Sequence, residues 1–598
     1  MKSKWQTTNT RLEDFLVRAF QKNKSLFNII GASAGTASSY FLSQSLSKEI
    51  SDLPRLVVIS SLERALAFEQ QLNFFSPLFR SHVLHPWDVS PFSGLFPSPE
   101  VRNSKSNFLY WAARAQKNDI FIVPVSALLQ LSSPFFLFNK RCKKLAAGDE
   151  LPNELASYLN SLGYQSAPVV EDVGQYSLRG GIVDIFSPAH KSPVRLELFG
   201  DQLESLRNFS IGDQRSLDVI SEFNLVPIYE FDLNDENIEA VIARLREDFK
   251  IRGVKPSEVD EIIRSISLKN YFAGCEFLLP YCYDKLSSVL DHFSSELNLF
   301  FLDESEVSRA ADEYIQEIEA DYKSNLNNSS VIFAPEPQKI LARYENIPWP
   351  KGSRFFNFSN LSFLDDEKPE EERITYSSLP LTEFSLLAQN LTPASEAWIK
   401  AAKPKITAWI ESGHKIFISI KNQTQVDRLK TLLQKMDLNF ETAAPDEYLW
   451  DVWLENTEQI TLVPRLFPET CLLVEEKIVF LRSDDFFGKK QRANTQNAYE
   501  QFSSKAKSLA FGDLKPNDLI VHVKHGIGVY EGLKIMNIGG ADSEFIQIAY
   551  KDKDKLYLPV YRVGQLQKFS GATQTTILDK LGGIAWEKTK IKVKAHLR

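Results

Sequence analysis

The sequence predicts a multidomain chain that combines α/β domains with β-rich ones. Its 598 residues correspond to about four domains at the usual domain size. Residues 1–132 and 376–490 alternate short β-branched runs with amphipathic helical segments, which is typical of parallel sheets covered by helices. Residues 133–229 and 505–575 instead carry short alternating strands separated by Gly, Pro and Asp, which indicates antiparallel sheets.

The first α/β domain has three clear strand candidates, which are LFNII (26–30), RLVVIS (55–60) and DIFIVPV (119–125). Helical periodicity returns after the β-rich insert, from residue 230 to about 375, where the acidic stretch DDEKPEEER favours a solvated linker. In the second α/β unit, HKIFISI and QITLV are strand candidates and QVDRLKTLLQKM is helical. The five or so strands after residue 505, with tight polar turns, suggest a small barrel of the Tudor/SH3 type.

The turn after the first strand, in IIGASAGTASSY, lies where a phosphate-binding loop of the form G-x-x-x-x-G-K-[ST] would lie. Gly31 and Ser38 fit this template, but Thr36 stands at its second glycine and Ala37 at its lysine. The lysine supplies the positive charge that holds the terminal phosphates. We therefore interpret the loop as a degenerate, non-functional nucleotide site retained as a structural turn.

Composition narrows the function classes. Hydrophobic residues make up 43% and charged residues 24%, as in soluble globular chains, and the net charge of −8 argues against a nucleic-acid coat along the whole chain. The four scattered cysteines predict reduced thiols and no metal site. With neither a signal peptide nor an apolar run of about 18 residues, we expect a cytoplasmic protein with no membrane contact.

No catalytic residue can be nominated. None of the eight histidines lies in an HExxH motif or beside a GxSxG elbow, and the carboxylates are not clustered. The sequence therefore predicts that this chain is not an enzyme and that it carries no cofactor.

Two strands suggest binding instead. In PVRLELF, alternation places Val194, Leu196 and Leu198 on one face, and Arg195 with Phe199 on the other. An arginine beside an exposed aromatic residue is typical of a protein-binding hot spot. The alternative, that Phe199 packs at a sheet edge and Arg195 is a solvated charge, is equally compatible with the pattern.

In the C-terminal β-rich unit, GVYEGLKIMNI is the second candidate binding strand. We expect it to place four side chains on an exposed sheet edge that a partner strand can join, namely Tyr530, Leu533, Ile535 and Met536.

The segment EDVGQYSLRGGIVDIFSPAHKSPVRLELFGDQLESLRNFS resembles a stretch shared by the excinuclease component UvrB and the bacterial transcription-repair coupling factors (Mfd). WDVSPFSGLFPSPEV and DIFIVPVSALLQ resemble the coupling factors. LIVHVKHGIGVYEGL and IQIAYKDKDKLYLPVYRVGQLQKFSG resemble their RNA-polymerase-interacting domain, which is akin to the CarD family, and LDKLGGIAWEKTKIKVK resembles the junction with their motor.

The resemblance implies a domain order. The predicted parts are a UvrB-like α/β domain with a degenerate P-loop (1–132), an inserted UvrA-binding domain (133–229), the returning part of the first domain with the acidic linker (230–375), a small α/β domain (376–490), the polymerase-interacting domain (505–575) and the start of a linker helix to a motor (576–598).

The resemblance also implies a function in transcription-coupled nucleotide excision repair. The chain would be the adaptor portion of such a factor, which binds the β subunit of stalled RNA polymerase and recruits the excinuclease component UvrA. Translocation on double-stranded DNA, with its ATP and Mg²⁺, would belong to a motor half that we do not expect in this chain. UvrA contacts would fall on Arg179, Arg195 and Phe199, and polymerase contacts on Met536 with Leu533 and Ile535.

Two alternatives remain open. One is a divergent UvrB-like ATPase, against which the missing lysine at position 37 speaks. The other is a stand-alone CarD-like transcription regulator whose N-terminal part is only a scaffold.

Overall fold

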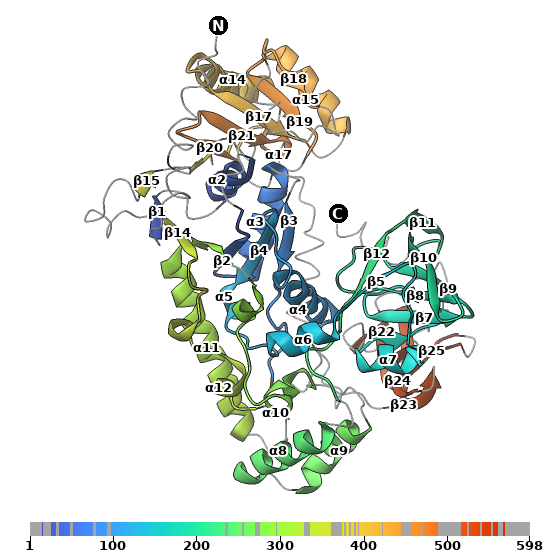
Figure 1. Cartoon of the computed structure of the whole chain (residues 1–598). Helices are drawn as coiled ribbons and strands as arrows, with labels where there is room; N and C mark the ends of the chain where they lie inside the picture. The colour runs from blue at the N-terminus through green and yellow to red at the C-terminus, as the bar shows by residue number, and fades with distance from the viewer. Residues whose placement is uncertain are drawn as a thin grey trace.

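In the part of the chain that it describes, the computed structural model contains four sheets of five or more strands and one two-stranded ribbon (Figure 1). The residues that it describes are 15, 26–30, 35–47, 52–75, 79–92, 97–152, 154–233, 237–253, 256–268, 275–294, 296–327, 335–359, 373–375, 378–381, 384, 386–387, 390–392, 394–420, 423–443, 457–465, 467, 470–487, 516–522, 526–538, 541–551, 554–559 and 566–568. The multidomain combination of α/β and β-rich parts is thus as predicted. The expected acidic linker, apart from its last residue, and the basic segment 576–598 lie outside this description.

The first α/β domain is built on a seven-stranded sheet in the order β15-β1-β14-β13-β2-β4-β3, whose neighbouring strands are all parallel. Its central strands are buried at every position and apolar after their first residue, as expected for a sheet covered on both faces. The strands are β1 (Leu26–Ile30), β2 (Arg55–Ile59), β3 (Arg80–Val83), β4 (Asp119–Pro124), β13 (Asn298–Leu302), β14 (Arg354–Ser359) and β15 (Arg373–Thr375). The first, second and fourth coincide with the predicted strands to within one residue.

Helices lie on both sides of this sheet and extend below it (Figure 1). The longer ones are α2 (Thr36–Ser47), α3 (Leu62–Phe75), α4 (Pro99–Ala112), α8 (Ile238–Ile251), α9 (Pro256–Ser267) and α11 (Glu304–Asn327). The shorter ones are α5 (Val125–Leu128), α6 (Phe135–Arg141), α10 (Leu279–Cys282) and α12 (Pro337–Ile340). Ser98 caps α4 by accepting a hydrogen bond from the Val101 amide, and Pro99 opens the helix.

The inserted domain leaves the first domain after α6 and returns to it before α8. Its main sheet has the order β11-β10-β9-β8-β7-β6 and is antiparallel from β7 to β11. The strands are β6 (Gln165–Ser166), β7 (Gln175–Arg179), β8 (Ile182–Ile185), β9 (Val194–Phe199), β10 (Gln202–Phe209) and β11 (Ser216–Val219), with the ribbon of β5 (Lys143–Ala146) and β12 (Glu222–Leu225) and the helix α7 (Leu155–Ser161) beside them.

The chain crosses twice between the first domain and the inserted one, and a buried polar network joins the two crossing segments. Lys105 Nζ lies 2.8 Å from Glu230 Oε1, and the amide of Ser133 donates to Glu230 Oε2 at 2.9 Å. Burial opposes ionisation of this carboxyl, but Lys105 and the hydrogen bonds outweigh it and hold the pKa of Glu230 below its ordinary value. Arg141 adds a bond to the carbonyl of Phe231 at 3.0 Å. The segment that leaves the insert is thereby fixed to the one that enters it.

The second α/β unit packs against the first. Its sheet has the order β16-β20-β21-β17-β19-β18, with parallel pairing around β17 (Lys415–Ser419). Phe467 and Phe480 meet Phe74 of α3, with ring centroids 4.7 and 6.0 Å apart. The other elements are β16 (Ser378–Pro380), β18 (Glu441–Thr442), β19 (Ile460–Val463), β20 (Cys471–Leu473), β21 (Ile478–Arg482), α14 (Glu396–Glu411), α15 (Gln423–Lys435) and α17 (Ser483–Phe487).

The C-terminal unit is an antiparallel sheet in the order β25-β24-β23-β22-β26. In the described residues this sheet is open, so closure into a barrel of the Tudor/SH3 type stays a prediction. Its strands are β22 (Leu519–His522), β23 (Gly526–Ile538), β24 (Ala541–Ala549), β25 (Lys555–Pro559) and β26 (Leu566–Lys568).

Candidate partner-binding surfaces

The RGG and FGD motifs of the inserted domain are two tight hairpin turns at the same end of its sheet. Gly180 and Gly181 connect β7 to β8, and Gly200 with Asp201 connects β9 to β10. Gly180 and Gly200 have φ values of +61° and +64°, which glycine adopts without steric cost. A Cβ on Gly181 would lie 2.9 Å from the carbonyl oxygen of Leu198, so the close approach of β8 to β9 also requires glycine.

Strand β9 alternates as its sequence predicts. Val194 and Leu196 are fully buried in the core beneath the sheet, whereas Phe199, on the last rung before the turn, is 80% exposed. Burying a phenylalanine side chain typically stabilises a protein by about 2–3 kcal/mol, and Phe199 makes no such contribution to the fold. Of the two interpretations of Phe199, the structure favours the exposed aromatic residue over the packed sheet edge.

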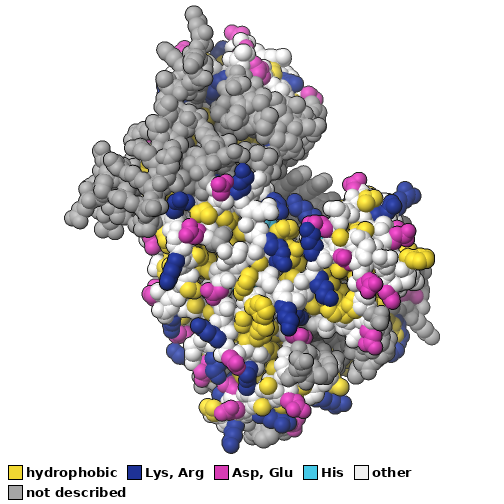
Figure 2. Space-filling view, viewed as in Figure 1, with side chains coloured by type: hydrophobic (Ala, Val, Ile, Leu, Met, Phe, Trp, Pro, Cys, Tyr) yellow, Lys and Arg dark blue, Asp and Glu magenta, His cyan; other side chains and the backbone are white. Residues whose placement is uncertain are grey.

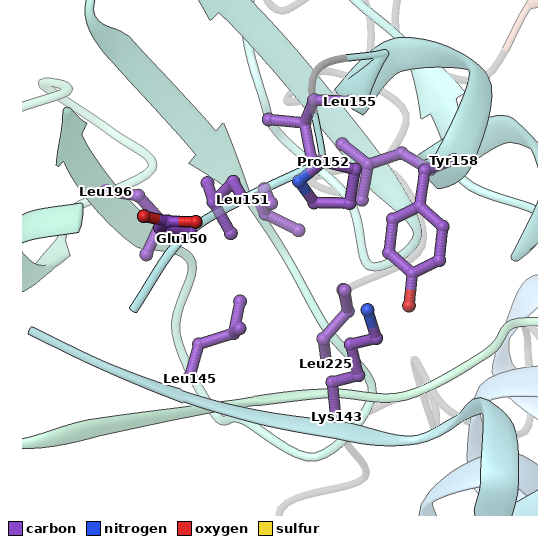
Figure 3. Close-up of a pocket in the computed structure, with 11 residues that line it drawn as sticks. Lys143, Leu145, Glu150, Leu151, Pro152, Leu155, Tyr158, Leu196 and Leu225 are labelled. Atoms are coloured by element: carbon purple, nitrogen blue, oxygen red, sulfur yellow. The ribbon is translucent and has the colours of Figure 1, made fainter. Parts of the chain in front are cut away.

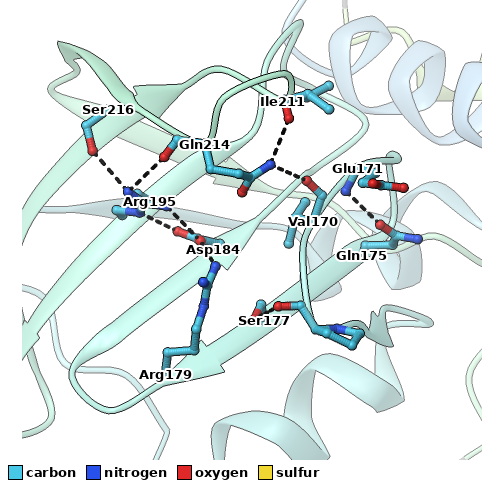
Figure 4. A network of polar contacts seen from close by, with 11 residues as sticks. Val170, Glu171, Gln175, Ser177, Arg179, Asp184, Arg195, Ile211, Gln214 and Ser216 are labelled. Atoms are coloured by element: carbon cyan, nitrogen blue, oxygen red, sulfur yellow. Dashed lines mark hydrogen bonds and ion pairs between the residues drawn. The ribbon is translucent and has the colours of Figure 1, made fainter. Parts of the chain in front are cut away.

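One buried carboxylate organises the outer face of this sheet (Figure 4). Asp184 on β8 is fully buried and accepts hydrogen bonds from Arg195 Nε at 2.7 Å and from Arg179 Nη2 at 2.8 Å. Arg195 also donates to the carbonyl of Gln214 at 3.4 Å and to Ser216 Oγ at 3.3 Å. The network therefore ties strands β7, β8 and β9 to the segment that leads into β11.

Arg195 is thus not the solvated charge of the alternative interpretation. Its side chain is only 16% exposed, and its guanidinium lies 4.9 Å from the centre of the Phe209 ring. The hydrogen bond with Asp184 raises the pKa of Arg195 above its ordinary value. Arg179, by contrast, is half exposed at the hairpin end, on the same side of the sheet as Phe199.

Asp184 is the residue that sequence reasoning missed. The sequence feature that points to it is a single charged residue inside the otherwise apolar strand IVDI. In the structure this residue lies directly across from Arg195 in the β8–β9 register. A charge at such a position is rarely buried unless an opposite charge meets it.

Below the same sheet lies a small apolar cavity (Figure 3). Its volume is about 20 Å³, and its lining includes Leu145, Leu155, Tyr158, Leu196 and Leu225. A space of this size holds about one water molecule. It is therefore a packing defect of the core and not a ligand site.

In the C-terminal sheet, the structure corrects one expectation and supports part of another. Tyr530 is not on an exposed edge: it is 4% exposed, because β24 flanks it on one side and the backbone of Asn517 and Asp518 on the other. Further along β23, Leu533 is 44% exposed and lies opposite Ile546.

In the described residues, the C-terminal part of β23 pairs with a strand on one side only. Ile535 and Met536 lie opposite Glu544 and Ser543 of β24, and beyond Tyr530 β23 pairs with β24 alone among the described strands. The backbone of this hairpin therefore offers an edge of the kind that partner strands join.

The candidate nucleotide loop is a packed helix start. Thr36, Ala37 and Ser38 form the first turn of α2, and all three are fully buried. Ser38 Oγ donates to the carbonyl of Gly35 at 3.0 Å, so its hydroxyl is already used within the turn. Gly31, the remaining residue of the template, lies outside the described residues.

The described residues hold neither a candidate metal site nor a candidate membrane span. They contain no group of three or more His, Cys, Asp or Glu side chains placed to hold a metal ion. Within the same described segments, no helix combines the length and apolarity needed to span a membrane.

Comparison with known families defines the class of protein. Residues 144–231, which carry the Phe199 surface, match the family described as UvrB interaction domain, and residues 514–570, which contain β23, match the CarD-like/TRCF RID domain. The chain therefore combines a UvrB interaction domain with a CarD-like/TRCF RID domain.

Two curated relatives that match most of this chain are named transcription-repair-coupling factors. The chain is 31% identical to that of Myxococcus xanthus over 564 residues, which is 91% of this chain and 46% of the relative. It is 24% identical to that of Staphylococcus aureus strain MRSA252 over 561 residues, or 90% of this chain and 45% of the relative. The chain thus spans about half the length of the curated relatives it matches, and the resemblance expected from the sequence is confirmed.

Proposed function

We propose that this chain is an adaptor in transcription-coupled nucleotide excision repair, which holds stalled RNA polymerase and recruits UvrA. The observation that carries this proposal is Phe199. It is 80% exposed at the end of a rigid hairpin, within the residues that match the UvrB interaction domain. Exposed aromatic residues on well-braced strands are the usual anchors of protein interfaces, because they bury much area at little entropic cost.

The UvrA-binding surface of this proposal consists of Phe199 and Arg179, with Arg195 as a positioning residue behind them. Arg195 and Asp184 fix the strands that carry the two exposed side chains. Pre-organisation of this kind lowers the entropic cost of association.

The polymerase-binding surface is the outer part of β23, with Leu533, Ile535 and Met536. Its support is the match of residues 514–570 to the CarD-like/TRCF RID domain and the edge of the β23–β24 hairpin. We assign the contact to the β subunit of RNA polymerase. We assign ATP and Mg²⁺ to a translocase motor of complete coupling factors and not to the turn at Thr36–Ser38.

A binding measurement with two matched variants tests the UvrA surface. Phe199→Ala should weaken UvrA binding by about tenfold or more, as truncation of an interface anchor does. Phe136→Ala is the matched control, because Phe136 is also highly exposed, at 71%, but lies on α6 of the first domain. Equal UvrA affinity of both variants and the unmodified chain would refute the assignment.

The polymerase surface is tested in the same way. Met536→Arg should weaken polymerase binding about tenfold while leaving UvrA binding unchanged, because an unpaired charge at an apolar contact is costly. Leu379→Arg, at a 51% exposed leucine of the second α/β unit, is the control. Unaltered polymerase affinity of Met536→Arg would refute this half of the proposal.

A further inference from the structure

One segment of this acidic chain is strongly basic. From Tyr110 to Lys144 the only acidic residue is Asp119, and the chain as a whole carries a net charge of −8. The six basic residues of the segment are Arg114, Lys117, Lys140, Arg141, Lys143 and Lys144. The segment runs from the end of α4 through α6 to β5, and Figure 2 shows Lys and Arg side chains gathered over α4 and α6, next to apolar surface. The positive charge therefore lies where the first domain passes into the inserted one.

The side chain of Arg114, just after the end of α4, is held in place by contacts with neutral groups. Its guanidinium lies 4.0 Å from the centre of the Tyr110 ring and donates to the Tyr110 carbonyl at 3.1 Å and to Asn139 Oδ1 at 2.9 Å. All three partners are neutral. The bond to Asn139 also links the end of α4 to α6.

The neighbouring cations are held in the same manner. Arg141 donates to the carbonyls of Tyr229 and Phe231, each at 3.0 Å. Lys143 Nζ lies 4.6 Å from the centre of the Tyr158 ring. Among the described side chains, no carboxylate forms an ion pair with these two residues or with Arg114.

Two nearby carboxylates have other partners. Asp119 is fully buried and contacts Arg80 at 2.8 Å and His82 at 3.2 Å. Glu222 pairs with Lys144. The charge of Arg114, exposed Lys140, Arg141 and Lys143 is therefore not cancelled by either of them.

We infer that Arg114, Lys140, Arg141 and Lys143 form a surface that binds the phosphodiester backbone of duplex DNA. Duplex DNA presents about one negative charge per 1.7 Å, and bound lysines and arginines release its counterions. Guanidinium groups fixed by neutral acceptors meet phosphate oxygens without first breaking an ion pair. Because phosphate contacts carry no sequence information, the binding is independent of base sequence and strongly salt-dependent. This inference rests on neither of the two docking surfaces proposed above.

The test is fluorescence anisotropy of a labelled short duplex titrated with the full chain, at several salt concentrations. Lys140→Glu/Lys143→Glu should weaken binding by about tenfold or more and reduce the slope of log K against log salt by about two. The control is Lys323→Glu/Lys400→Glu, which makes the same charge change on exposed positions of α11 and α14 and should alter affinity less than about twofold. The milder pair Lys140→Gln/Lys143→Gln, with thermal unfolding of every variant, separates lost binding from lost folding.

Three outcomes would overturn the inference. The first is equal weakening by the two charge-reversed pairs, which would mean that only net charge matters. The second is binding of a single strand of the same sequence as tightly as the duplex. The third is displacement of the duplex by polyglutamate at equal charge concentration, which would indicate a surface for acidic polypeptides.

Discussion

Two motifs of this chain have opposite environments. One is the candidate nucleotide loop at the first turn of α2, and the other is the hairpin motif at the end of strand β9. Thr36, Ala37 and Ser38 are fully buried, whereas Phe199 is 80% exposed. The first set consists of small residues, and the hydroxyl of Ser38 donates to the carbonyl of Gly35 within its own helix turn. The second is a large aromatic residue without a place in the core.

The difference between the two places lies in their packing. At α2, small side chains allow the helix to join the apolar cluster that unites the first sheet with Phe467 and Phe480 of the second α/β unit. At β9, the buried Asp184 and the two arginines bonded to it hold in place the strand that carries the exposed Phe199. The covered environment suits an element that serves only the fold, and the braced, exposed one is what the proposed UvrA contact requires.

Restoring the missing lysine at position 37 tests whether the first turn of α2 serves only the fold. Ala37→Lys should lower the free energy of unfolding by about 3–5 kcal/mol and confer no ATP hydrolysis, because it forces an unpaired ammonium into a fully buried site. Denaturant unfolding and an ATPase assay measure both. Ala397→Lys, on the exposed first turn of α14, is the control and should change stability by less than about 0.5 kcal/mol. Native stability together with ATP turnover would mean that α2 is a poised nucleotide site.

The inserted domain should be sensitive to acid through His190. Its Nε2 accepts a hydrogen bond from the Asn224 amide at 2.9 Å, and its ring stacks on Phe223. Burial lowers the pKa of His190 from 6.5 to about 4, so the unfolded chain binds more protons between these values. The neutral His190 ring therefore contributes its full stabilisation above pH 6.5. This stabilisation falls by about 3 kcal/mol as the pH drops to about 4, at roughly 1.4 kcal/mol per pH unit.

The measurement is the pH dependence of unfolding for the unmodified chain and for His190→Gln. The amide oxygen of glutamine can accept the same bond but does not titrate. The difference between the two stability curves should therefore be flat above pH 6.5 and steep between 6.5 and 4. A difference that is flat over the whole range would show that His190 is not held as a neutral acceptor.

Removal of the charge at Asp184 should have the next largest effect. Asp184→Asn leaves Arg195, which is 16% exposed, without its counter-charge, and should destabilise the inserted domain by about 2 kcal/mol. It should also weaken UvrA binding although position 184 itself is buried. Asp213→Asn, at a half-exposed carboxylate near Arg215, is the control and should leave both quantities nearly unchanged. Normal UvrA affinity of Asp184→Asn would show that the braced geometry is unnecessary.

Periodicity and turn chemistry predicted the regular parts of this fold. Strands β1, β2 and β4, and the buried face of β9 with Val194 and Leu196, follow from apolar runs and period-two alternation, which are local properties. The burial of Asp184 depends on Arg179 and Arg195, which belong to two neighbouring strands, and the burial of Tyr530 depends on the backbone of Asn517 and Asp518. Such pairings across strands are set by register and tertiary contact, and a single sequence does not encode them locally.

The finest test compares the two arginines that share Asp184. Arg179 is half exposed, and pairs of this kind contribute up to about 1 kcal/mol, so Arg179→Ala should barely affect stability. Arg195→Ala should cost more, because it leaves the buried carboxylate of Asp184 with one partner and also removes the bonds to Gln214 and Ser216. If Arg179 contacts UvrA directly, its loss lowers affinity with no change in unfolding, whereas loss of Arg195 lowers both together. The reverse pattern would exchange the roles of the two residues, with Arg179 as the brace and Arg195 as the contact.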